Sequence, residues 1–330
     1  MSMASIRAII PAAGIGKRMR PLTLTRPKVL LPLAGRPIIG HLINDLVRIG
    51  VTEITVVVGY YHEKVEEYCK KAFPEVNFRF TMQEKRLGLG HAVGEAISPD
   101  DEAVLIVLGD TLFRGNIGDL KGDTAALGLV EVDDPSRFGI AVVEEDRIVN
   151  LEEKPDNPKS NLALAGVYFV PDAQKLAGAI RHIVENDVKT RGEYQITDAL
   201  EKMIKDGETF RPVTLKGWYD CGLPSTLLET NQALLDEKPE LNRVPDKFRA
   251  SNIIIEPVSL DDSAKIENCV IGPYVHVGPE VTLTRSIVRN SIIDAKSVLE
   301  GQRLDGAVLG QEVERRSEGE SLLLGDFSTL

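Results

Sequence analysis

Short apolar runs alternate with amphipathic segments over the first hundred residues. Segments of strand length that are rich in apolar residues occur at residues 6–10, 53–58, 77–81 and 103–108. Segments with apolar residues at helical spacing lie between them, at residues 37–50, 62–71 and 89–97. This alternation predicts an α/β fold whose parallel sheet is covered by helices on both faces. In such sheets ligands bind beyond the carboxyl ends of the strands, where the loops emerge.

The pattern becomes richer in strands after residue 124. Strand-like runs occur at residues 125–131, 138–144, 147–152 and 162–169, and helical patterns at residues 193–205 and 225–235. Residues 236–250 are polar, contain two prolines and show little periodicity, which predicts a linker. We therefore expect a first domain of residues 1–235 with a Rossmann-like, mixed and mainly parallel sheet.

A six-residue period replaces both patterns after residue 251. Apolar residues repeat at this step at Ile271, Val277 and Leu283, with Val275 and Val281 four residues after a leading position. The pairs 260/266 and 293/299 keep the same step, and the shifts of phase around residues 266–271 and 283–293 predict loops. This period indicates a hexapeptide repeat, so we expect a short left-handed parallel β-helix at residues 251–330. A plain β-meander is the alternative.

Composition limits the class of protein. The chain has 330 residues, 43% apolar and 27% charged, and no apolar run reaches the ~18–20 residues that span a bilayer. The apolar stretch 8–15 runs into basic residues and not into a cleavage site, so no signal peptide is expected. Three widely spaced cysteines, Cys69, Cys221 and Cys269, form neither a disulfide framework nor a metal knuckle. These features predict a cytoplasmic protein.

Charge is unevenly distributed. The net charge of −11 argues against nucleic-acid or membrane partners, because both bind basic surfaces. Residues 1–44 nevertheless hold seven lysines and arginines and no acidic residue. A solvated basic patch is one interpretation. Because the cations cluster around glycines at the end of a predicted strand, a small polyanion is the other.

The glycine loop at residues 11–21 directly follows the first predicted strand. It is not a P-loop, since its only Gly-Lys pair is followed by Arg18, and it is not a dinucleotide motif, since Met19 replaces the third glycine. Gly14 and Gly16 would allow backbone to approach phosphate closely, and Lys17 with Arg18 would neutralise its charge. The loop therefore favours phosphate binding, although a glycine turn with solvated basic residues would look similar.

Several motifs in order resemble those of the sugar-phosphate nucleotidyltransferases, also called nucleotide-sugar pyrophosphorylases. The N-terminal part reads Gly14-Ile15-Gly16-Lys17-Arg18-Met19, Pro21-Leu22-Thr23 and Pro27-Lys28-Val29-Leu30-Leu31-Pro32. The resemblance continues through Gln83, Gly88-Leu89-Gly90-His91-Ala92, Leu108-Gly109-Asp110, Phe138-Gly139, Glu152-Glu153-Lys154-Pro155, Gly192-Glu193-Tyr194-Gln195-Ile196-Thr197-Asp198 and Trp218-Tyr219-Asp220-Cys221-Gly222. Ala13 and Lys17 depart from the family, which usually has glycine and threonine there.

The resemblance implies a reaction in which a sugar 1-phosphate oxygen attacks the α-phosphorus of a nucleoside triphosphate and releases pyrophosphate. It implies Mg²⁺ as the cofactor, held by Asp110 and Asp220, and Arg18, Lys28 and Lys154 as catalytic cations. The nucleotide-binding residues that it implies are Ala13, Gly14, Gly16, Lys17, Gln83, Gly88 and Asp110. The sugar-phosphate-binding residues that it implies are Gly139, Glu153, Lys154 and Gly166.

Two subclasses share these motifs. The Gln83–His91 region and residues 192–200 resemble the glucose-1-phosphate uridylyltransferases. The Trp218 motif, together with a hexapeptide tail that ends Leu324-Gly325-Asp326, resembles the long form of glucose-1-phosphate thymidylyltransferase, which we favour because a tail is a gross architectural feature. We expect dTTP or UTP and glucose 1-phosphate as substrates.

Other functions remain open at this point. The tail could be an acyltransferase, but it is short and has one histidine, His276, so a packing and oligomerisation module in a homo-oligomer is the expectation. A regulatory subunit without catalysis is a further alternative for the whole chain. The presence of Arg18, Lys28, Asp110 and the other implied catalytic residues argues against it.

Overall fold

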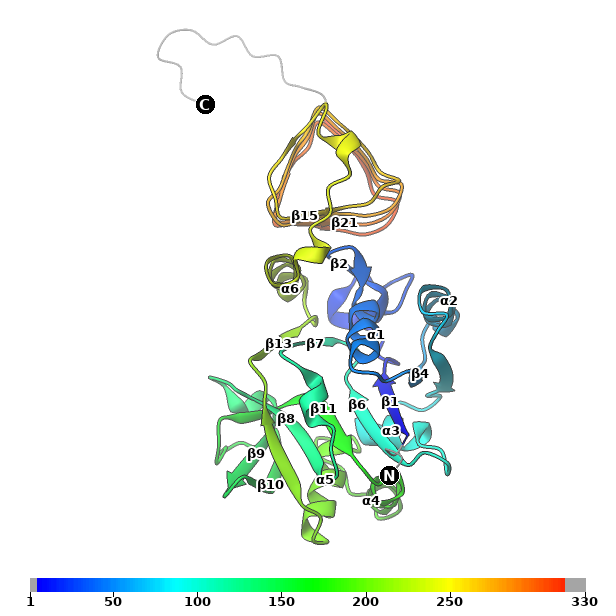
Figure 1. Ribbon diagram of the computed structural model, residues 1–330, viewed down its shortest axis with the longest axis vertical. Helices are drawn as coiled ribbons and strands as arrows, with labels where there is room; N and C mark the ends of the chain where they lie inside the picture. The colour runs from blue at the N-terminus through cyan, green and yellow to red at the C-terminus, as the bar shows by residue number, and fades with distance from the viewer. Residues whose placement is uncertain (1–4, 318–330) are drawn as a thin grey trace. The chain divides into compact units, whose positions relative to one another are not determined.

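The computed structural model describes residues 5–317, and these fall into two compact units (Figure 1). The first contains residues up to Leu31 and from Pro37 to Leu223, and the second contains Pro32–Arg36 and everything from Pro224 onward. Helix α6 (Pro224–Glu237) thus groups with the C-terminal repeats. The division into domains at residues 235 and 250 stays a prediction. The motif at residues 324–326 lies outside the described residues.

The first unit is built around a nine-stranded mixed sheet. Strand β1 (Ile6–Pro11) lies between β4 (Glu53–Val58) and β6 (Ala103–Val107) and runs parallel to both, and β5 (Asn77–Met82) continues the parallel part beyond β4. Every residue of β6 is buried, as expected of a strand covered on both faces. The predicted parallel arrangement of these strands is confirmed.

Antiparallel pairs extend the sheet beyond β6. Strand β11 (Leu162–Val170) pairs antiparallel with β6, β8 (Ala125–Glu131) and β9 (Gly139–Glu144). The remaining strands are β10 (Arg147–Glu153), antiparallel to β9, and β12 (Phe210–Thr214), parallel to β8. A separate antiparallel pair consists of β7 (Thr111–Arg114) and β13 (Gly217–Asp220). The predicted mixed sheet is therefore confirmed, while β7, β12 and β13 are not among the predicted strands.

Five α-helices accompany the sheet in the described part of the first unit. They are α1 (Ile38–Arg48), α2 (His62–Ala72), α3 (Leu89–Ala96), α4 (Ala173–Glu185) and α5 (Ile196–Lys205). Helices α3, α4 and α5 contact one another and bury apolar side chains in one cluster with strand residues such as Ile9 and Ile106. Helix α4 is not among the predicted helices, although Asp172 caps it by accepting from the amides of Gln174 and Lys175.

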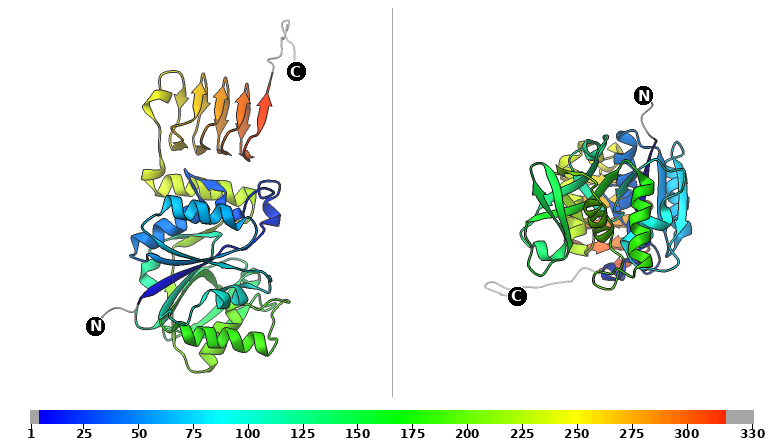
Figure 2. Two further views of the ribbon diagram at one scale, coloured as in Figure 1. Left: turned by 90° about the vertical axis from the view of Figure 1, so that its right-hand side faces the viewer. Right: turned by 90° about the horizontal axis from the view of Figure 1, so that it is seen from below.

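The second unit contains a parallel β-helix. Its three four-stranded sheets appear in Figure 1 as the sides of a triangle and in the left view of Figure 2 as stacked short strands. The first sheet is β14 (Ile253–Ile254), β17 (Val270–Ile271), β20 (Ile287–Arg289) and β23 (Arg303–Asp305). The second is β15 (Val258–Leu260), β18 (Val275–Val277), β21 (Ser291–Ile293) and β24 (Val308–Leu309). The third is β16 (Lys265–Glu267), β19 (Thr282–Thr284), β22 (Val298–Glu300) and β25 (Glu314–Arg316).

The residues of the six-residue period fill the interior of this β-helix. Ile271, Val277, Leu283, Val275 and Val281 are all fully buried. The hexapeptide prediction is confirmed, and the three-sided arrangement fits the left-handed form.

Residues 236–250, expected as a linker, pack on the β-helix. They form two short 3₁₀ helices, Pro239–Leu241 and Asp246–Phe248, and the Phe248 ring is buried in the core of the repeats. The backbone N–H of Arg243 donates to the carbonyl of Val258 at 2.8 Å. This segment is therefore continuous with the second unit.

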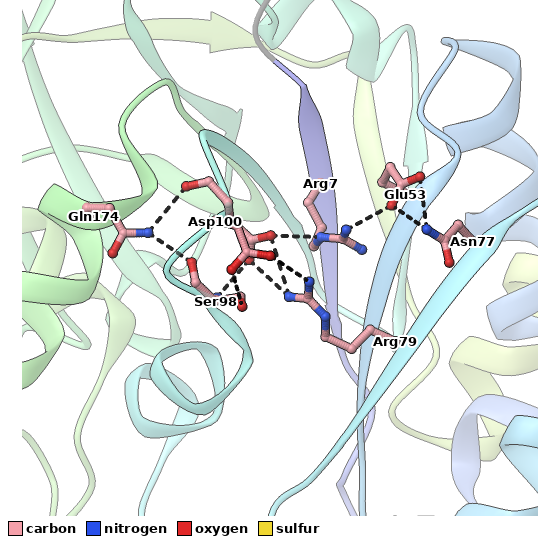
Figure 3. Close-up of polar contacts among 8 residues, drawn as sticks. Arg7, Glu53, Asn77, Arg79, Ser98, Asp100 and Gln174 are labelled. Atoms are coloured by element: carbon pink, nitrogen blue, oxygen red, sulfur yellow. Dashed lines mark hydrogen bonds and ion pairs between the residues drawn. The ribbon is translucent and has the colours of Figure 1, made fainter.

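An ion-pair network joins the amino ends of the parallel strands (Figure 3). Arg7 on β1 donates from Nε to Asp101 Oδ1 and from Nη2 to Glu53 Oε2, each at 2.8 Å. The Ser98 amide donates to Asp101 Oδ2 at 2.8 Å, and Arg79 Nη1 lies 3.4 Å from both Asp101 oxygens. The Asp101 side chain is only 3% exposed, so arginines, not water, compensate its charge.

We expect Asp101→Asn to lower the free energy of unfolding by about 3 kcal/mol, because removing one partner of a buried ion pair leaves the other uncompensated. Urea denaturation measures the loss. Asp100→Asn is the matched control: its side chain is 82% exposed, and its nitrogen–oxygen distance to Arg79 is 4.0 Å, so the loss should stay below about 1 kcal/mol. Equal losses in the two variants would contradict the importance of this network.

Candidate active site

Loops that follow β1, β5 and β6 surround one cavity of about 310 Å³ at the carboxyl ends of the parallel strands. This is within the ~300–1,000 Å³ of ordinary ligand pockets. Six of the predicted site residues line it: Ala13, Gly14, Lys28, Gln83, Gly88 and Asp110. Gly16, Lys17 and Arg18 belong to the same glycine loop but are not part of the lining.

The glycine loop packs tightly against the segment that carries Lys28. Gly16 has a φ of +67°, and a Cβ atom there would lie 2.9 Å from Lys28 Cβ, so both its conformation and its surroundings favour glycine. The hydroxyl of the buried Thr23 donates to the Gly16 carbonyl at 2.8 Å. A Cβ at Gly14, by contrast, would meet nothing within 4 Å, so this stretch of backbone is open to the approach of a ligand.

Lys28 and Asp110 form the central ion pair of the cavity. Lys28 Nζ lies 2.8 Å from Asp110 Oδ2, and the lysine side chain is 9% exposed while the aspartate is 45% exposed. The residue before Asp110, Gly109, packs against the end of β1, and its amide donates to the Pro11 carbonyl at 3.2 Å. A Cβ atom at Gly109 would lie 2.6 Å from that carbonyl oxygen, so the close approach requires glycine. The buried ammonium thus has its counter-charge, and the carboxylate keeps an exposed side.

Asp220 is presented on the strand beside Asp110. Strands β13 and β7 pair Asp220 with Thr111, and the Cys221 amide donates to the Asp110 carbonyl at 3.1 Å. A Cβ at Gly222 would lie 2.8 and 2.9 Å from the two Asp220 oxygens and 3.2 Å from Arg18 Nη2. The absence of a side chain at Gly222 therefore makes room for both groups.

The carboxylates of Asp110 and Asp220 fit a Mg²⁺ ion by chemistry. Mg²⁺ prefers oxygen ligands and is usually held by one or two carboxylates together with substrate phosphates and water. Within residues 5–317 there is no group of three or more histidine, cysteine, aspartate or glutamate residues that could hold a metal.

A second group of predicted residues lies on the β9–β10 hairpin. Gly139 pairs with Glu153, and a Cβ at Gly139 would lie 3.0 Å from Glu153 Oε2. Thr197 Oγ1 donates to Glu153 Oε2 at 2.7 Å, and Lys154 Nζ lies 3.4 Å from Glu153 Oε1. Lys154 has a φ of +46°, and its amide donates to the Phe138 carbonyl at 2.9 Å. Gly139, Glu153 and Lys154 do not belong to the cavity lining.

Gly166 connects the β9–β10 group to the cavity. It lies in β11 at a break in the pairing with β8, with a φ of +89°, and its carbonyl accepts from the Leu108 amide at 2.9 Å. A Cβ there would lie 2.7 Å from the Leu108 side chain. Because Leu108 precedes Gly109 and Asp110, the two groups of predicted residues are joined through neighbouring strands.

Gln83 and Gly88 form the other wall of the cavity. Gln83 is 9% exposed, and its side-chain Nε2 donates to the Gly88 carbonyl at 3.3 Å, which orients the amide. Gly88 has a φ of +125°, and a Cβ there would lie 2.5 Å from the Tyr194 carbonyl, so no other residue fits without displacement.

Three residues without a predicted role also belong to these surroundings. Arg86 and Glu193 line the cavity, and Thr197 holds Glu153. Glu193 and Thr197 lie inside a motif that the sequence singles out. Arg86 has no signal except its place between Gln83 and Gly88.

Asp198, next to Thr197, is a half-buried carboxylate. Its Oδ1 accepts from Thr190 Oγ1 at 3.0 Å, while its buried Oδ2 has no hydrogen-bond partner. Burial, opposed by the Thr190 hydrogen bond and assisted by the charge of Glu153, raises the pKa of Asp198 above its ordinary value of 3.8.

Comparison with known proteins identifies relatives over the whole chain. The family model described as "Nucleotidyl transferase" matches residues 7–237. A low-salt glycan biosynthesis nucleotidyltransferase of Haloferax volcanii is 33% identical, over 98% of this chain and 99% of the relative. A glucose-1-phosphate thymidylyltransferase of Streptomyces antibioticus is 31% identical over 98% of both chains.

A solved structure of apo UDP-glucose pyrophosphorylase matches the fold with a TM-score of 0.61 and 25% identity. The match covers 70% of this chain and 98% of that one. That structure therefore matches only part of this chain.

Asp198→Asn should change how stability depends on pH. Because the folded state raises the pKa of Asp198, it binds this proton more tightly than the unfolded chain does, and the stability that the proton contributes is lost as pH rises above about 4. Asparagine cannot ionise, so the stability of the variant relative to the original protein should increase between pH 4 and pH 7. Urea denaturation at several pH values measures this difference, and a difference that stays constant or falls would contradict the assignment.

Proposed function

Because the chain belongs to the nucleotidyl transferase family and is a sugar-1-phosphate nucleotidyltransferase, we propose that it uses dTTP and glucose 1-phosphate and forms dTDP-glucose and pyrophosphate. The observation that carries this choice is the thymidylyltransferase relative, which aligns over 98% of both chains. The relative thus spans the repeats as well as the catalytic part. The test is release of pyrophosphate from a panel of triphosphates and sugar 1-phosphates.

The proposed chemistry requires no nucleophile from the protein. A non-bridging oxygen of the sugar phosphate forms a bond to the α-phosphorus, and the bond from that phosphorus to the bridging oxygen breaks, so that both electrons leave with pyrophosphate. The obstacle is repulsion between two polyanions: unit charges ~4 Å apart at an effective dielectric of ~20 repel by ~4 kcal/mol. The enzyme's task is then to position and neutralise.

Cations of this chain supply that neutralisation in our proposal. Arg18 binds the β- and γ-phosphates, Lys28 stands beside the transferred phosphoryl group, and Lys154 binds the sugar phosphate. Lys28 is supported best, because it lines the cavity and its ammonium is paired with Asp110. Glu153, held by Thr197, accepts hydrogen bonds from sugar hydroxyls.

Asp110 and Asp220 would hold Mg²⁺, which supplies charge neutralisation at the phosphates when bound. The exposed side of Asp110 and the position of Asp220 on the adjacent strand support this assignment.

The nucleotide-binding wall is the basis for proposing a pyrimidine. Gln83 can donate and accept at a pyrimidine edge through its carboxamide, and the Gly88 backbone stands beside it. UTP is the second candidate, because a methyl group distinguishes thymine from uracil by only ~1–3 kcal/mol. The solved UDP-glucose pyrophosphorylase, at 25% identity, supports that candidate.

An acyltransferase activity of the β-helix finds no support at His276. This histidine is 4% exposed, and its Nδ1 accepts from the Gly35 amide at 3.2 Å. Assembly into a homo-oligomer and a cytoplasmic location stay predictions. No helix within residues 5–317 is long and apolar enough to cross a membrane.

The two arms of the substrate pair should respond to different variants. Lys154→Ala should raise KM for the sugar 1-phosphate about tenfold or more with little change for the triphosphate, because a charge-assisted hydrogen bond is worth ~1.5–3 kcal/mol. Arg18→Ala should raise KM for the triphosphate or lower kcat. Steady-state kinetics with each substrate varied in turn measures both. Equal effects of both variants on both substrates would contradict the proposed roles.

Substitution of either aspartate should change how the rate of turnover depends on the Mg²⁺ concentration. Asp110→Asn and Asp220→Asn should each lower kcat about 100-fold or more and raise the Mg²⁺ concentration needed for half-maximal rate, since each loses a charged oxygen ligand. Asp119→Asn serves as a control, because Asp119 lies away from the cavity and accepts from Asn116. Near-normal rates at saturating Mg²⁺ in either site variant would reject the metal assignment.

A further inference from the structure

A two-residue turn follows the segment that carries Lys28. The turn lies between β2 (Pro32–Leu33) and β3 (Arg36–Pro37), and its central residues Ala34 and Gly35 have φ values of +41° and +90°. Both values are positive, as in the type I′ turns of tight hairpins. Alanine rarely adopts this conformation, so surrounding contacts must hold it.

The turn belongs to the second unit, and two side chains of that unit bind both of its amides. Such a turn directs the amides of its two central residues away from its strands, so they need other acceptors. The Ala34 amide donates to Asn231 Oδ1 at 2.9 Å, and the Gly35 amide donates to His276 Nδ1 at 3.2 Å. Ala34 itself is completely buried.

The two acceptors are fixed in orientation. Asn231, on α6, is fully buried, and its Nδ2 donates to the Tyr274 carbonyl at 3.1 Å, so its Oδ1 faces the turn. Burial lowers the pKa of His276 to about 4, so its ring is neutral near pH 7 and Nδ1 can accept the hydrogen bond from the Gly35 amide. A Cβ at Gly35 would lie 2.7 Å from Ser259 Oγ, so the turn fits closely against β15.

The turn is linked to Lys28 by a short and well-bonded stretch of chain. Lys28 begins the 3₁₀ helix Lys28–Leu30, and the Leu31 amide donates to the Lys28 carbonyl at 2.9 Å. The Ile38 amide then donates to the Leu31 carbonyl at 3.1 Å and closes the base of the hairpin. Ala34, the first residue of the turn, thus lies six positions after Lys28 in the chain, with hydrogen bonds at Lys28 and Leu31 in the stretch that joins them.

We propose that Asn231 and His276 are positioning residues for Lys28, because they hold the turn that follows Lys28 closely in the chain. The proposal rests on the proposed function for the role of Lys28. It assigns no chemistry to the two residues. Their hydrogen bonds hold the β2–β3 turn, and the turn holds the ammonium beside Asp110.

The test uses full-length His276→Leu, His276→Asn and Ser297→Ala. His276→Leu removes the acceptor, whereas His276→Asn offers an oxygen near the position of Nδ1. Ser297 is the matched control: it is also buried in the β-helix and accepts from a backbone amide, that of Val313, and its other hydrogen-bond partner is the Gly310 carbonyl, also outside the turn. Asn231→Ala removes the other hydrogen bond and decides the question if His276→Leu fails to fold.

Three measurements are made on each variant: the melting temperature, the kinetic constants, and hydrogen–deuterium exchange of the peptide that spans residues 28–37. We expect His276→Leu to speed exchange of this peptide at least tenfold and to lower kcat about 10- to 100-fold, since small displacements of a catalytic group are costly. KM for the sugar 1-phosphate should change less than threefold. His276→Asn should restore both kcat and slow exchange, while Ser297→Ala should lower only the melting temperature.

The inference is overturned if His276→Leu keeps kcat within twofold, if Ser297→Ala loses kcat equally, or if exchange at residues 28–37 does not change. Absence of turnover in the original protein with every substrate pair would instead reject the proposed function. The exchange measurement needs no substrate, so it decides independently whether His276 holds the Lys28 segment.

Discussion

A buried ammonium requires a counter-charge, and the ion pair of Lys28 with Asp110 meets this requirement in the cavity of the first unit. Lys28 follows β1 and Asp110 follows β6, 82 residues later in the chain, and the two meet because β1 and β6 are neighbouring parallel strands. Gly109 permits that approach at the Pro11 carbonyl, and Gly16 permits the glycine loop to lie against Lys28. The glycines at these positions are thus explained by the geometry of one charge pair.

Much of the fold could be predicted from the sequence because its buried apolar residues recur at regular spacing. Strand β6 is a continuous apolar run, and Ile271 and Val277 belong to a six-residue apolar repeat; all of these residues are buried. Each pattern lies within a short stretch of sequence and is typical of one kind of secondary structure. The placement of Ala13, Lys28 and Gln83 around one cavity also follows, because loops at the carboxyl ends of parallel strands converge. The chemical roles of these residues come from family resemblance and remain predictions.

Features that depend on distant partners could not be predicted. The β2–β3 turn has no apolar period, and what stabilises Ala34 is an amide oxygen almost two hundred residues later in the chain. Strand β13 has only half-buried residues, so no apolar run announces it. Arg86 enters the cavity wall because of the path of its loop, and one arginine in a polar loop carries no signal of that path.

The first coils of the β-helix carry the residues that contact the β2–β3 turn. Ser259 and His276 belong to the strands β15 and β18, at the beginning of the stack, and each later coil pairs only with its neighbours. Coils could therefore be added or deleted beyond β21 during evolution while the contact with the turn is preserved. The number of coils can thus change without any change to the residues that contact the turn. Coils added beyond β21 would allow the repeats to serve as a spacer or as a platform for fusion to another protein.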